Sequence, residues 1–254
     1  MGRAPSLLIR GSAAAALLVA LLAYYVWQES LPRLGLWSDI ALIAVVLIPA
    51  VFALVGLALP LRGAIGLLPV GLAAIVLAAV CQHAGWGIPA NFVKLGATTA
   101  LAFWFLGYFE SALWVALVAL IVPWVDAYSV WRGPTHHIVH HQQHLFTTLS
   151  FAFPVPGEHG SANLGVPDLL FFALFLAAAA RWRMRVGWTW LALVASLGAT
   201  MAIAVWAGLA GLPALPGLAL AFLLPNADLL WAELRRARAR SRHEPGTDTR
   251  TDSG

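Results

Sequence analysis

The 254 residues are strongly apolar: 61% are hydrophobic, only 10% are charged, and the mean hydropathy is +0.83. A soluble domain carries roughly 25% charged residues, so this chain lacks the polar side chains that would cover a water-facing surface. The formal net charge of +4 is the balance of fourteen Arg and one Lys against eleven acidic residues. Most of the basic residues lie in short connections and near the chain ends. That distribution indicates a membrane protein and no nucleic-acid partner. The single cysteine, Cys81, excludes an internal disulfide and a cysteine-based zinc site.

A helix that crosses a bilayer needs about 20 apolar residues for a hydrocarbon core of ~30 Å. The sequence predicts eight such segments, with seven or nine as alternatives, at residues 11–28, 39–60, 63–82, 92–109, 111–131, 164–181, 186–208 and 213–232. We therefore expect an all-α, polytopic transmembrane helical bundle that forms a single domain over residues 1–232. The first segment is interpreted as a retained helix, because aromatic residues follow it and no small-residue cleavage site is evident.

Two stretches are polar. Residues 132–163 are rich in His, Gln, Pro and Gly and predict an extramembrane loop, and residues 233–254 form a basic tail whose far end is expected to be disordered. Cytoplasmic segments carry the excess of Arg, and eight spans place the tail, the connection at 181–185 and the N-terminus on one side. The prediction is an integral protein of a lipid bilayer with both termini cytoplasmic. Its Ala- and Arg-rich composition favours a prokaryotic cell membrane.

Acidic residues within the predicted spans are functional candidates, because ionisable groups at membrane depth are costly. Asp126 lies about five residues from the outer end of its span, and Asp168 about four residues from the start of the next. The two helices flank one loop, so their carboxyl groups are expected at a similar depth. Asp228 lies fifteen residues into the last span and is interpreted as an interfacial charge near the inner surface, and Glu110 stands at a boundary between spans.

Two carboxyl groups that share a site hold one proton between them near neutral pH. The ionised member can take a proton from an attacking water, and the protonated member can polarise a carbonyl and help the amine leave. This chemistry needs no metal, nucleotide or other cofactor. A structural interpretation stands beside it: Asp168 follows Pro167 at a helix start, where both residue types are favoured, and Asp126 has aromatic neighbours typical of a membrane interface.

The residues around both aspartates resemble a known family. Segment 124–131 (WVDAYSVW) is similar to the first catalytic segment of presenilins and signal peptide peptidases, the intramembrane aspartyl proteases with a Gly-x-Gly-Asp motif. Segment 165–168 (GVPD) resembles that second motif, and segment 213–216 (PALP) matches the family's Pro-Ala-Leu signature. The three occur in the family's order. The match covers residues 111–232, the half expected to be catalytic.

The resemblance implies a prokaryotic presenilin-like endopeptidase that cleaves transmembrane protein or peptide substrates with Asp126 and Asp168. It also implies that Gly165 and Pro167, together with the signature residues, shape the substrate site; the signature residues are Pro213, Ala214 and Leu215. Two residues depart from the family pattern. Val125 replaces a Tyr, and Pro167 replaces a Gly, which changes the allowed φ and removes one N–H.

Two other functions remain open. The departures at Val125 and Pro167 would also suit a non-catalytic presenilin-like membrane scaffold or binding protein. A proton- or metal-coupled transporter would use the aspartates as a relay and a histidine cluster as ligands, since i,i+4 histidines on a helix suit transition metals. That cluster comprises His136, His137, His140, His141 and His144. It is equally interpreted as a polar loop that responds to pH, and we assign no metal site.

Overall fold

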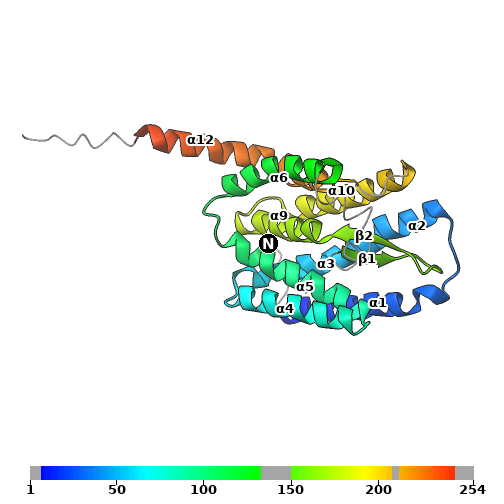
Figure 1. The fold of residues 1–254 in the computed structure, drawn as a ribbon. Helices are drawn as coiled ribbons and strands as arrows, with labels where there is room; N and C mark the ends of the chain where they lie inside the picture. The colour runs from blue at the N-terminus through cyan, green and yellow to red at the C-terminus, as the bar shows by residue number, and fades with distance from the viewer. Residues whose placement is uncertain (1–6, 133–149, 208–211, 244–254) are drawn as a thin grey trace, which may run out of the picture.

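The computed structural model describes residues 7–132, 150–207 and 212–243, and these are mostly helical with one small β-hairpin (Figure 1). The first half contains α1 (Leu7–Trp27), η1 (Gln28–Ser30), α2 (Leu36–Leu42), η2 (Ile43–Leu47), α3 (Ile48–Ala58), η3 (Leu59–Gly63), α4 (Leu67–His83) and α5 (Gly87–Leu106). The second half contains α6 (Ala112–Arg132), β1 (Ser150–Pro154), β2 (Ser161–Gly165), α9 (Val166–Arg181), α10 (Val186–Trp206), α11 (Leu215–Leu223), η4 (Leu224–Asn226) and α12 (Ala227–His243).

Four helical segments of the described chain are long and apolar enough to cross a membrane: Leu7–Ser30, Leu36–Gly63, Val186–Trp206 and Leu215–Ala239. Leu67–His83 and Ala112–Tyr128 are shorter apolar helices. Each predicted span overlaps a helical segment, but the count of eight spans stays a prediction. The all-α expectation needs a correction, because β1 and β2 form a two-stranded antiparallel sheet.

Helix α9 is the centre of the bundle. Its residues 172–179 are completely buried, and it packs against α5 on one side and against α10 and α11 on the other. Figure 1 shows it between these helices, whereas α4 lies outside and packs on α5. Large apolar side chains on α1, α4 and α6 point outward, as expected where lipid replaces water. Helices α10 and α11 lie close together at Gly217 of α11, where an added Cβ would collide with the Ser196 hydroxyl of α10.

The hairpin occupies part of the stretch predicted as an extramembrane loop. Phe151 and Phe153 of β1 are completely buried. The Phe151 ring makes edge-to-face contacts with Tyr25 of α1 and Phe92 of α5 and a tilted contact with Phe153. The interpretation of residues 132–163 as one polar loop is therefore wrong for 150–163. The strand-and-turn signal in the sequence consists of large apolar side chains at alternate positions in SFAFP, alternating polar and apolar residues in SANLG, and Gly157 between them at φ 68°.

The last span is interrupted at Pro225, where α11 passes through η4 into α12. Buried Asn226 compensates for the break: its amide oxygen accepts the Arg185 N–H, and its amide nitrogen donates to the Thr189 hydroxyl and the Phe222 carbonyl. Helix α12 then continues through residues 233–243, the first part of the predicted tail, and extends away from the bundle (Figure 1). The tail's far end, 244–254, lies outside the described residues.

Candidate active site

Asp126 lies on α6, one turn beyond Pro123. A proline inside a helix removes one N–H and leaves the carbonyl four residues earlier without its helical donor, so the backbone is irregular directly before the aspartate. Asp126 is half-buried, and its Oδ2 accepts a hydrogen bond of 3.1 Å from the backbone N–H of Leu215. The first predicted aspartate is therefore tied to the start of α11.

Asp168 is the third residue of α9, whose N-cap is Gly165 in an extended conformation (φ −63°, ψ 147°). The Gly165 backbone donates a hydrogen bond to the Asp168 carboxyl group, the arrangement in which an acid at N3 satisfies an N–H at the helix start. A Cβ at Gly165 would lie 3.2 Å from Asp168 Oδ2. The glycine therefore provides both the donor and the space that orient this carboxyl group.

Pro167 is the second residue of α9 and is exposed. The first-turn N–H groups of a helix have no intrahelical acceptor, and a proline φ is already helical. Replacing the family's glycine with proline at this position therefore removes no hydrogen bond of the helix.

The Pro-Ala-Leu segment brings the two aspartate helices together. Helix α11 packs against both α6 and α9, and at its start Ala214 and Leu215 are 4% and 5% exposed. Pro213 is half-buried beside them. All three sequence motifs consequently lie at one end of the α6, α9 and α11 group.

The electrostatics of this site come from the two carboxyl groups. The charge of Asp126 acts on Asp168, which is also half-buried. Neither has an ion-pair partner among the described residues, where the ion pairs join Glu29 to His159 and Arg185 to Asp228. Two neighbouring carboxyl groups without a compensating cation share a proton most readily. The arrangement can therefore present one acid and one base to the same substrate.

The strand that leads into Asp168 has an open edge. Ala152 of β1 turns its N–H and carbonyl away from β2, towards the Asn91 side chain. In a regular antiparallel ladder its partner Asn163 then turns its own backbone groups away from β1, and Gly165, two residues on, directs its N–H to Asp168. Within the described part of the chain no third strand pairs with this edge.

Sequence reasoning missed the residues that cover the opposite edge, on β1. Tyr24 and Tyr25 of α1 donate their hydroxyl groups to the carbonyls of Pro154 and Ala152 at 2.9 and 2.8 Å. Lys94 of α5 donates to the Ser150 carbonyl at 2.6 Å. Asn91 and Lys94, polar side chains three residues apart in an apolar span, were the sequence signal for such a role. The N-terminal half, outside the family resemblance, therefore positions the hairpin.

Other predicted candidates lie elsewhere. Asp228 pairs with Arg185 on the exposed surface, as expected for an interfacial charge, and Glu110 lies exposed at the connection between α5 and α6. The histidine cluster 136–144 lies outside the described residues. Among those that are described, no group of three or more His, Cys, Asp or Glu side chains is suited to hold a metal ion.

Comparisons of the chain with protein-family models, with curated proteins and with solved structures find no match.

Proposed function

We propose that this protein is a presenilin-like intramembrane aspartyl endopeptidase that cleaves transmembrane segments with Asp126 and Asp168. The observation that carries the proposal is the hydrogen bond from Leu215 N–H to Asp126 Oδ2. This bond joins the segment around Asp126 to the Pro-Ala-Leu segment, 89 residues further along the chain. Asp126 also interacts electrostatically with Asp168 of the GVPD segment. Contact between motifs that lie far apart in the sequence supports the view that their resemblance to the family is not accidental.

The geometry suggests how the two carboxyl groups divide the work. Oδ2 of Asp126 is occupied by Leu215, which leaves Oδ1 for a water or for the shared proton. One carboxylate takes a proton from water as it attacks the scissile carbonyl, and the protonated partner polarises that carbonyl and later protonates the leaving amine. No cofactor takes part. Gly165 and Leu215 act as positioning residues, because each donates a backbone N–H to one aspartate.

A substrate helix must unwind before cleavage, because its carbonyls are bonded within the helix. The open edge of β2 offers a place for the unwound segment, which would pair as a third strand. Its scissile bond would then be delivered where β2 ends, three residues before Asp168. The substrates of this proposal are transmembrane proteins or peptides held in the same bilayer.

The proposal includes a location in a prokaryotic cell membrane with both termini cytoplasmic. The arginines at 181–185 and 235–242 mark the cytoplasmic end. The aspartates then lie towards the outer surface, as in signal peptide peptidases rather than presenilins.

The test is cleavage of a transmembrane peptide by the purified protein in liposomes. Asp126→Ala and Asp168→Ala should each abolish cleavage, because neither carboxyl group can act alone. Asp228→Ala is the matched control: it removes a third span-borne aspartate, one that is exposed and paired with Arg185, and should leave cleavage intact. Cleavage that survives either of the first two substitutions would refute the proposal.

One observation favours a non-catalytic presenilin-like binding protein as the second candidate. Asp168 at N3 of α9 bonds the N–H of its own N-cap, which is a sufficient structural reason for an acid there. A transition-state isostere of aspartyl proteases separates the two functions. Labelling that is lost in Asp126→Ala excludes the binding protein, whereas a folded protein that is neither labelled nor active excludes the enzyme.

A further inference from the structure

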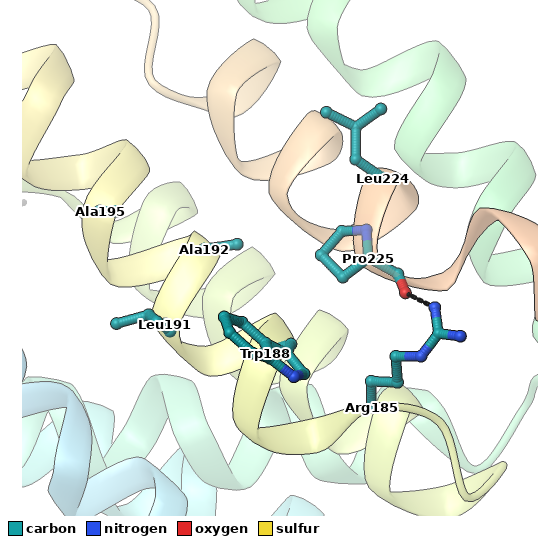
Figure 2. A pocket seen from close by; sticks show the side chains of 7 residues that line it. All are labelled: Arg185, Trp188, Leu191, Ala192, Ala195, Leu224 and Pro225. Carbon is teal, nitrogen blue, oxygen red and sulfur yellow. Dashed lines mark hydrogen bonds between the residues drawn. The ribbon is translucent and has the colours of Figure 1, made fainter.

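A surface groove lies between α10 and the α11–η4 segment, far from the aspartates. It is an open groove of about 620 Å³, a volume within the 300–1,000 Å³ typical of small-ligand sites. Figure 2 shows its lining, in which Trp188 and Leu191 come from α10, and Leu224 and Pro225 come from η4. Thirteen residues of α9, about 20 Å at 1.5 Å per residue, separate Asp168 from this end of the bundle.

The groove has one charged end and one apolar end. Arg185 stands at the start of α10, and the lining continues along that helix to Ala195. Ten residues of helix correspond to about 15 Å, over which the lining side chains are apolar. An indole such as that of Trp188, which is 67% exposed, typically lies at the level of lipid headgroups. A phospholipid has the same arrangement, with a charged headgroup at the membrane interface and an apolar acyl chain that extends into the bilayer.

Arg185 has a structural role at the charged end of the groove, and its guanidinium is not free to bind a ligand. Its guanidinium donates to both carboxylate oxygens of Asp228 at 2.8 and 2.7 Å and to the Pro225 carbonyl at 2.6 Å. The last of these bonds is drawn in Figure 2. These bonds tie η4 to α10 and hold the two walls of the groove together. The neutral Arg185–Asp228 pair leaves the net charge of this end to its neighbours.

The neighbour that carries this charge is Arg183, whereas Arg181 donates to the Leu106 carbonyl and lies over the Trp182 ring. Arg183 is exposed, two residues before Arg185, and within the described ranges no acidic side chain contacts it. It has φ 54° at the C-terminal end of α9, a left-handed position that favours glycine.

We propose that this groove binds an anionic glycerophospholipid, with one acyl chain along α10 and the phosphate beside Arg183. The charge complementarity selects an anionic headgroup, since arginines at a cytoplasmic interface attract anionic lipids. The site is separate from the aspartates and does not depend on the proposed proteolysis.

The test is native mass spectrometry of the purified full chain with phosphatidylglycerol or phosphatidylcholine carrying identical acyl chains. Wild-type protein should retain phosphatidylglycerol preferentially. Arg183→Gly should reduce that preference about fivefold, the value of about 1 kcal/mol for one arginine near the surface, and glycine suits the backbone at φ 54°, so the fold is kept. Arg10→Ala is the charge control on α1, which packs on α3 and α5, and should leave the preference unchanged.

A second pair of variants tests the acyl chain. Ala195→Trp places a ring in the groove at an exposed position and should reduce retention of both lipids, whereas Ala199→Trp, one turn further and also exposed, should not. Equal retention of the two lipids by wild-type protein would overturn the anionic assignment. A preference that survives Arg183→Gly would overturn Arg183 as its origin, and full retention in Ala195→Trp would overturn the groove. Thermal unfolding of each variant confirms that it is folded.

Discussion

The substitution Gly165→Ala tests whether the Asp168 carboxyl group reacts or only caps its helix. The backbone at Gly165 has φ −63°, which alanine adopts without strain. The new methyl group would lie 3.2 Å from Asp168 Oδ2 and 3.5 Å from Pro167 Cδ. Ordinary van der Waals contact begins at 3.4 Å, so the carboxyl group must move by a few tenths of an ångström.

The expected effects on rate and stability differ. A displacement of 1 Å at a reacting group can cost about 100-fold in rate, so a few tenths should lower kcat by roughly 3- to 10-fold with KM little changed. As an N-cap, alanine is less favourable than glycine by about 0.5–1 kcal/mol, a small loss for a bundle of this size. The substitution should therefore slow the reaction while leaving the protein folded.

The assay measures kcat and KM for a transmembrane peptide in liposomes, together with thermal unfolding of the same preparations. Gly160→Ala is the matched control: it adds a methyl group in the hairpin connection, where the nearest atom, Glu158 Oε2, is 4.0 Å away. An unchanged kcat in folded Gly165→Ala would show that the position of the Asp168 carboxyl group does not limit the reaction. That result would refute the reasoning that makes Gly165 a positioning residue.

Three further substitutions test the scaffold. Asn226→Ala removes a buried side chain with three hydrogen bonds and should lower the free energy of unfolding by about 1–3 kcal/mol, measured by denaturation in detergent against wild type. Tyr25→Phe removes one hydrogen bond to the Ala152 carbonyl, which retains the Asn91 amide, so the loss should be only about 0.5–1.5 kcal/mol; a larger loss would mean that the ring contacts also change. Pro167→Gly should lower stability by up to about 1 kcal/mol and leave kcat/KM unchanged, and a gain in activity would show that Pro167 restrains the site.

The hydrophobic runs predicted the helical segments, and the positions of Asp126 and Asp168 predicted that their carboxyl groups lie at a similar depth. Both predictions follow from local features of the sequence. A span is recognised by length and composition, and two aspartates beside one connection are placed by counting residues along their helices. The resemblance added the Pro-Ala-Leu segment. The hydrogen bond from the Leu215 N–H to Asp126 could not be predicted from residue spacing, because it joins two distant segments of the chain.

The hairpin was not predicted, for a physical reason. Five-residue strands such as SFAFP carry a weak periodic signal, and the histidines and glutamines before them suggested a polar loop. What makes the hairpin possible is non-local: Tyr25 and Asn91, more than 60 residues apart, satisfy the backbone of Ala152. In an apolar surrounding an uncovered strand edge is costly, so the position of β1 depends on partners that the sequence around it does not contain.

Backbone irregularities gather around both aspartates. Pro123 precedes Asp126 in α6, β2 ends at the start of α9, and α11 begins beside Asp126 with Pro216 in its first turn. Each irregularity exposes N–H or carbonyl groups, which a hydrocarbon environment does not tolerate unless protein or water satisfies them. The Gly165 and Leu215 N–H groups are satisfied by the aspartates themselves. The remaining groups, such as the outward-facing backbone groups of Asn163, require water or another strand, and the proposed hydrolysis of a peptide bond would use both.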